Sequence, residues 1–106
     1  MSGEIDNSVV RFTGNVNISN ISDAHNILLA ALEQNDSITI DIDGLEEADL
    51  TFVQLIESAR LSAKEGECSI TLRQPAHGAV LQVLQRGGFL DSEDRDRTDF
   101  WLQGAN

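Results

Sequence analysis

The sequence holds little cysteine and no long apolar run. Cys68 is its only cysteine, which rules out an intramolecular disulfide and a metal site made of several cysteines, and which fits a reducing compartment. Nowhere do the about twenty apolar residues that span a bilayer follow one another, and the first residues have neither the basic segment nor the apolar run of a signal peptide. We therefore expect a cytoplasmic protein that does not insert into a membrane.

Basic residues are also scarce. Seven Lys and Arg residues stand against eighteen Asp and Glu residues, which gives a net charge of −11 and a pI near 4.2. This balance disfavours sequence-independent binding to nucleic-acid phosphates or anionic lipid, so we expect no nucleic-acid partner. The acidity is regional, because residues 1–50 hold ten acids and one base.

The length of the chain suits one small domain. With 106 residues, of which 41% are apolar, one core must serve the whole chain. We expect a single domain over residues 1–106, with its core at about 9–90 and a C-terminal extension at 91–106.

Alternation of apolar and polar side chains predicts strands in residues 9–13, 37–43 and 68–73, each with one face exposed to solvent. Apolar residues at helical spacing predict helices in residues 24–32, 52–64 and 77–85. Ser22 is the expected N-cap of the first helix.

The order of these segments, strand and helix three times over, predicts parallel strands joined by helical crossovers. We expect an α/β fold, a mixed, mostly parallel sheet of four to five strands with helices packed mainly on one face, because doubly covered strands would be apolar throughout. The first residues add an antiparallel strand through a turn at residues 6–8. After a charged, solvated run, the apolar residues 100–102 predict that the tail docks as a closing strand or turn.

An acidic run leads into the second predicted helix. Its five acids lie within nine residues: Asp41, Asp43, Glu46, Glu47 and Asp49. The run is either a solvated loop or a docking surface for a basic partner. Thr51 follows at the carboxyl end of a strand, the edge where ligands of open α/β sheets gather, and with Gln54 it also forms a capping-box pattern.

Residues 38–52, ITIDIDGLEEADLTF, resemble the central signature of the STAS domain family, the sulphate-transporter and anti-sigma-factor-antagonist family. Asp41, Gly44 and Asp49 match the signature without a gap, and the resemblance covers about residues 9–90. In that family the first hydroxyl residue after the Asp is the usual phosphoacceptor for a partner serine kinase. Leu50 stands at that position here, Thr51 is the second hydroxyl position, and Phe52 replaces a small Gly.

The resemblance implies a non-enzymatic interaction module in a bacterial signalling pathway. Its partner is expected to be a kinase, of the anti-sigma or sensory histidine type, or an anti-sigma factor. Thr51 is the candidate phosphoacceptor, although Leu50 at the usual position leaves its modification open. The expected partner-binding residues are Asp43, Glu46, Glu47, Asp49, Leu50, Thr51 and Phe52.

Leu50 and Phe52 would be exposed apolar anchors for a constitutive contact, unless Phe52 faces the core. The alternative function is an accessory subunit of a transport ATPase complex, without phosphorylation. The sequence leaves the oligomeric state open.

No catalytic constellation stands out. Cys68 lies on the apolar face of a predicted strand, where a buried inert thiol is expected. His25 and His77 have no second His or Cys at metal-ligand spacing. We therefore expect no enzymatic activity, no catalytic residue, no metal and no cofactor.

Overall fold

The computed structural model describes residues 2–6, 9–91 and 95–103, with the side chains of residues 9–90 and 97–102. The elements in chain order are β1 (Ser2–Asp6), β2 (Val9–Val16), α1 (Ile21–Gln34), β3 (Ser37–Asp41), β4 (Leu45–Ala48), α2 (Leu50–Glu65), β5 (Ser69–Leu72), α3 (Gly78–Arg86), the 3-10 turn η1 (Phe89–Asp91) and α4 (Arg95–Gln103). The three strand-helix units predicted by periodicity are present.

The sheet is mixed and mostly parallel. Its strand order is β1-β2-β3-β5, and β4 pairs with the end of β2. The ladders between β2 and β3, β3 and β5, and β2 and β4 are parallel, whereas β1 is antiparallel to β2. The expected N-terminal strand is therefore present, while residues 7 and 8 of its predicted turn lie outside the described residues.

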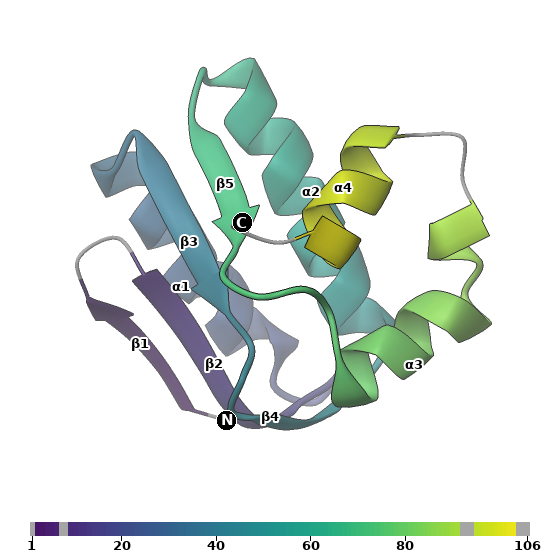
Figure 1. Cartoon of the computed structure of the whole chain (residues 1–106). Helices are drawn as coiled ribbons and strands as arrows, with labels where there is room; N and C mark the ends of the chain where they lie inside the picture. The colour runs from purple at the N-terminus through teal and green to yellow at the C-terminus, as the bar shows by residue number, and fades with distance from the viewer. Residues whose placement is uncertain (1, 7–8, 92–94, 104–106) are drawn as a thin grey trace.

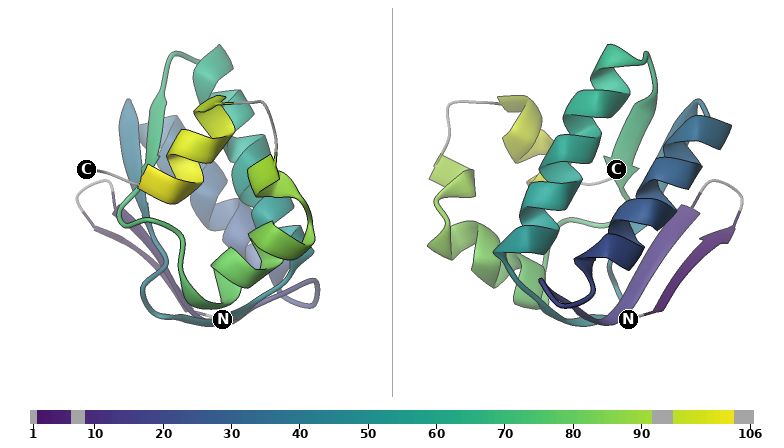
Figure 2. Two further views of the ribbon diagram at one scale, coloured as in Figure 1. Left: turned by 45° about the vertical axis from the view of Figure 1, so that its right-hand side comes forward. Right: turned by 180° about the vertical axis from the view of Figure 1, so that it is seen from behind.

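Of the described helices, α1 and α2 cover one face of the sheet, and α3 and α4 lie beyond its β5 edge. In the left view of Figure 2 the strands are on the left and the helices are on the right. The view from behind shows α1 and α2 side by side across the sheet, and Figure 1 shows α3 and α4 on the far side of β5 from β1. Within the described segments, no helix combines the length and the apolar character that a bilayer span requires.

The core lies between the sheet and these helices. One face of β2, β3 and β5 supplies it, with Val10 and Phe12 from β2, Ile40 from β3 and Leu72 from β5 all at most 1% exposed. Such burial is the main stabilising term of a domain of this size. Helix α2 contributes an inward stripe, which is Phe52, Ile56, Ala59 and Ala63.

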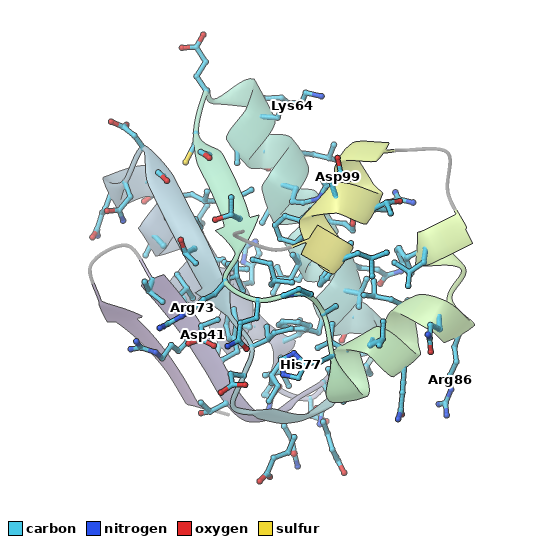
Figure 3. The ribbon with its side chains drawn as sticks, viewed as in Figure 1. Asp41, Lys64, Arg73, His77, Arg86 and Asp99 are labelled. Atoms are coloured by element: carbon cyan, nitrogen blue, oxygen red, sulfur yellow. The ribbon has the colours of Figure 1, made fainter. Side chains whose placement is uncertain are left out.

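The uncovered face of the sheet carries a charged cluster. The carboxylate of Asp41 on β3 accepts from Arg11 Nε on β2 and from Arg73 Nη1 just after β5, at 3.3 Å each. Asp41 and Arg73 are adjacent in Figure 3, in front of the sheet. Asp41 is only 9% exposed, and its carboxylate links β3 to Arg11 of β2 and to Arg73 after β5. It is therefore not part of the acidic surface at the start of α2.

Several predicted boundaries differ from the observed ones, and for two of them the structure gives a local reason. The strand predicted over residues 37–43 ends at Asp41, because Asp41 Oδ1 accepts from the Asp43 N–H and closes a turn. Helix α1 begins at Ile21 with Asn20 as its N-cap, not at Ser22. The Asn20 side chain holds the preceding turn instead, since it bonds the Asn17 N–H and the Asn15 carbonyl.

The tail forms helix α4 instead of the predicted strand or turn. Trp101 is fully buried, and its ring packs edge-on against Phe100, with centroids 5.1 Å apart. The Trp101 carbonyl also accepts from the Ala76 N–H, 2.6 Å away. Part of the charged run predicted to be a solvated loop, residues 92–94, lies outside the described residues.

A buried carboxylate on α2 holds α4 in place. Glu57 Oε1 accepts from Trp101 Nε1 at 2.6 Å, and Glu57 Oε2 accepts from Arg60 Nη2 at 3.2 Å and from Arg97 Nε at 3.3 Å. Three donors compensate the desolvation of one carboxylate, which is the condition under which a buried charge is tolerated.

Candidate functional site

The predicted site residues meet where β4 leads into α2. Asp43 is exposed in the turn after β3, and Glu46 and Glu47 are exposed on β4, in a segment predicted to be a loop. We call Asp43, Glu46 and Glu47 the acidic rim. Asp49, the fourth predicted acid, is the N-cap of α2.

Asp49 joins two segments that are distant in the sequence. Its Oδ1 accepts from the Thr51 N–H at 3.0 Å and from the Thr51 hydroxyl, and its Oδ2 accepts from the Ile18 N–H at 3.0 Å. The carboxylate therefore caps α2 and fastens the connection between β2 and α1 to the same point. A negative charge here also interacts favourably with the helix dipole.

These contacts set the charge state of Asp49. Burial raises the pKa of its carboxyl, but the hydrogen bonds from the Thr51 hydroxyl and from the N–H groups of Ile18, Phe52 and Thr51 outweigh burial and lower the pKa below 3.8. Asp49 is therefore a carboxylate at neutral pH. The capping box predicted between Thr51 and Gln54 is wrong, because Asp49 takes the capping role and the Thr51 hydroxyl donates to it.

The three residues after Asp49 have different exposures. Leu50 is 46% exposed, Thr51 is half-buried, and Phe52 is fully buried. Phe52 packs edge-on against Phe12, with ring centroids 5.5 Å apart. The prediction of Phe52 as an exposed, partner-binding anchor is therefore wrong, and its alternative, that Phe52 faces the core, is confirmed.

A groove borders Leu50 between the start of α2 and the end of α3. It encloses about 370 Å³ and is lined by Ala48, Asp49, Leu50, Val83, Arg86 and Gly87. Arg86 extends from the end of α3 away from the body of the molecule (Figure 3). The sequence gives no signal for the α3 wall, because only the packing of α3 beside β4 and α2 brings Val83 and Arg86 to this place.

Asp43 lies at the opposite end of α3 from this wall. Its Oδ1 is 3.6 Å from Nε2 of His77, the N-cap of α3, so the two form an ion pair when His77 is protonated. His77 Nδ1 is also 3.1 Å from the Pro75 carbonyl. The acidic rim therefore extends from the start of α3 along β4 to the start of α2.

The other residues weighed for chemistry are not gathered into a site. Cys68 is half-buried just before β5, and its thiol donates to the Asn35 carbonyl at 3.3 Å. Within the described part of the chain, no group of three His, Cys, Asp or Glu side chains is placed to hold a metal ion. The arrangement at the start of α2 offers an apolar side chain, a groove and a bordering negative charge, which suits binding.

Comparisons with known proteins identify the fold and the family. A crystal structure of an anti-sigma factor antagonist from Mycobacterium paratuberculosis is similar to this one, with a TM-score of 0.63 and 13% sequence identity over 93% of this chain and 91% of that chain. At that identity the likeness concerns the fold. No curated protein matches the sequence significantly. Residues 2–91 match the family model described as "Mlab, STAS domain", which includes every element except α4. The chain therefore belongs to the STAS domain family.

Proposed function

We propose that this protein is a non-catalytic binding module that docks on a partner protein through the start of α2. The observation that carries the proposal is Leu50, a large apolar side chain 46% exposed at the first position of a helix and next to a groove. Exposed apolar groups beside a concave surface and a polar border are typical of protein interfaces. The acidic rim supplies that border.

We propose a regulatory protein of a bacterial signalling pathway as the partner, either a kinase or an anti-sigma factor. Membership in the STAS family and the fold shared with an anti-sigma factor antagonist support this class. The exposed acids of the rim favour a partner with a basic contact surface, since complementary charges speed association and select the partner. We propose that the module acts in the cytoplasm.

The contact we propose does not depend on phosphorylation. Leu50 has no hydroxyl, and the hydroxyl of Thr51 donates to Asp49. A phosphoryl group on Thr51 would replace that donor by negative charge beside the Asp49 carboxylate, which opposes the modification. We therefore assign Thr51 a structural role, in which its hydroxyl and N–H hold Asp49 at the start of α2, in preference to a role as phosphoacceptor.

A second candidate is an accessory subunit of a transport ATPase complex. It is favoured by the same exposed Leu50, because a permanent apolar side chain at the phosphoacceptor position suits a contact that stays formed. The two candidates differ in the protein that is captured, a regulatory kinase or anti-sigma factor in one case and an ATPase in the other.

Affinity capture with charge-reversed variants tests the proposal. Glu46→Lys with Glu47→Lys should reduce capture of the partner, because it reverses the charge of the rim without touching a buried residue. The matched control is Glu65→Lys with Glu67→Lys, which reverses two exposed acids at the other end of α2. Equal capture by both double variants would contradict the proposal.

Two substitutions of Thr51 separate a switch from a fixed contact. Thr51→Ala and Thr51→Glu should capture the partner alike if Leu50 and the groove carry the contact. Loss of the partner from the Glu variant alone would indicate a phosphorylation switch. Circular dichroism of both variants shows whether α2 keeps its helix.

A further inference from the structure

Ile18 is the most exposed of the large apolar side chains in the described segments, at 72%. It lies in the connection between β2 and α1 and is not one of the partner-binding residues predicted from the sequence. A single exposed apolar residue is common on protein surfaces and needs no explanation. Ile18 differs because its N–H is bonded to Asp49, the residue that directly precedes exposed Leu50.

Hydrogen bonds fix the segment that carries Ile18. The Asn17 N–H donates to Asn20 Oδ1, the Ser19 N–H donates to Asn17 Oδ1, and Asn20 Nδ2 donates to the Asn15 carbonyl, all at 2.9 Å. With the bond to Asp49, the backbone on both sides of Ile18 is held. A side chain presented on a held backbone loses less conformational entropy on binding than one on a mobile loop.

The charges around Ile18 and Leu50 indicate the chemistry of the partner segment that would bind there. The acidic rim lies along β4, the strand that leads directly to Asp49 and Leu50. Residues 1–50 as a whole hold ten acids and one base. The groove beside Leu50 is lined on its other wall by Val83, Arg86 and Gly87. Exposed Ile18 and Leu50 are thus joined through Asp49 and have negative charge along the β4 border, so their complement is apolar with positive charge on the side that meets β4.

We propose that Ile18 and Leu50, held in register by Asp49, are paired anchors that dock an amphipathic helix with a leucine-rich face and a lysine- or arginine-rich border. Helices lay their apolar face into grooves of this kind and use regularly spaced anchors. The inference rests on the proposed function, and it adds a contact residue, Ile18, and the chemistry of the partner segment.

A pair of synthetic peptides tests the partner chemistry. One is a helical peptide with leucines on one face and lysines elsewhere, and the other has glutamates in place of the lysines. The Leu/Lys peptide should shift the amide NMR signals of Ile18, of residues 49–51 and of residues 83–87 in the isotope-labelled full chain, whereas the Leu/Glu peptide should shift none of them. The preference should weaken in the variant with both Glu46→Lys and Glu47→Lys.

Single substitutions test the two anchors. Ile18→Ser and Leu50→Ser should each weaken binding of the Leu/Lys peptide by about tenfold, the usual effect of removing a central apolar contact. Leu61→Ser is the matched control, because Leu61 is 62% exposed but lies near the far end of α2, and it should leave the affinity unchanged. Circular dichroism confirms that all three variants are folded.

The outcomes separate this inference from the proposed function. If Leu50→Ser weakens binding and Ile18→Ser does not, the paired anchor is wrong and the proposed surface stands. If signals shift instead along the groove between α1 and α2, which includes Leu29 and Leu55, the site is wrong. Equal binding of both peptides overturns the charge requirement. Self-association that Ile18→Ser abolishes would assign the surface to a second copy and overturn the proposed partner segment.

Discussion

Asp49 shows at the level of one residue how a helix cap also builds a surface. The Asp49 carboxylate accepts hydrogen bonds from an N–H of α2 and from an N–H of the connection before α1. Removing one of its oxygens therefore weakens the attachment between these two segments. The position of this cap next to Leu50 and Thr51 follows from the sequence, because Asp is a preferred N-cap and the helical pattern begins just after it. The hydrogen bond from the Ile18 N–H cannot be predicted in this way, because Ile18 is thirty-one residues away in the sequence and only the fold brings it next to Asp49.

Phe52 is a residue whose burial the sequence did indicate. It shares one helical stripe with Ile56, Ala59 and Ala63, the residues placed on the inner face of that helix. The expectation of an exposed Phe52 came from comparing its position with a signature Gly, and the periodicity of the helix outweighs that comparison.

The substitution Asp49→Asn should lower the free energy of unfolding by about 0.5–1.5 kcal/mol at neutral pH, the usual net value of one hydrogen bond, since Asn itself is a good N-cap. An amide has one acceptor oxygen, so it cannot serve Thr51 and Ile18 as the carboxylate does. Urea unfolding followed by circular dichroism measures the change. Asp43→Asn, at an exposed acid of the same surface, is the control and should differ little from the wild type.

The stabilisation by Asp49 should also depend on pH. Because the pKa of Asp49 is lowered by folding, its contribution is complete above the ordinary value of 3.8 and is lost as the pH falls through the lower pKa of the folded state. The difference in stability between wild type and Asp49→Asn should therefore shrink as the solution is acidified below that value. A difference that stays constant down to the acid transition would show that the charge of Asp49 is not what stabilises the cap.

At the scale of elements, the alternating pattern located β2, β3 and β5, and the helical spacing located α1, α2 and α3. Strand β4 was missed because its four residues, LEEA, place two acids side by side and do not alternate. It forms through backbone pairing with the end of β2, which no side-chain pattern reports. Helix α4 was missed because its apolar residues, 100–102, are consecutive and define no helical stripe.

Helix α4 is expected to depend on Trp101. Trp101→Ala should lower the free energy of unfolding by about 3–5 kcal/mol, because it leaves a cavity and takes a donor from buried Glu57. Trp101→Phe should cost less, since it keeps most of the ring and loses only the donor. Leu102→Ala is the control on the same helix, where the side chain is 39% exposed. A similar loss for Trp101→Ala and Leu102→Ala in urea unfolding would contradict this account of the docking.

At the scale of the whole molecule, charge of one sign dominates. With a net charge of −11, the acidic side chains repel one another in the folded state, although Asp41 and Glu57 are paired with arginines. This balance follows from composition alone. The placement of the pairs that Asp41 makes with Arg11 and Arg73, and of the pair between Glu57 and Arg97, does not, because their partners lie on, or directly after, different strands or helices.

Salt should therefore stabilise the fold. Raising the ionic strength from about 0.01 M to about 0.15 M shortens the Debye length from about 30 Å to about 8 Å and screens the repulsion among the acids. The urea midpoint of the wild type should rise, and the rise should be smaller in the variant with both Glu46→Lys and Glu47→Lys, whose net negative charge is lower. A midpoint that falls with salt would mean that the ion pairs of Asp41 and Glu57 outweigh the general repulsion.

The burial of Trp101 has a practical consequence, because the chain has no other tryptophan. Its ultraviolet emission reports on one place, the contact between α4 and Glu57 of α2. While the indole is shielded from water the emission maximum stays at short wavelength, and lifting of the C-terminal helix would shift it to the red. The unlabelled protein thus carries its own optical probe of whether this helix remains seated.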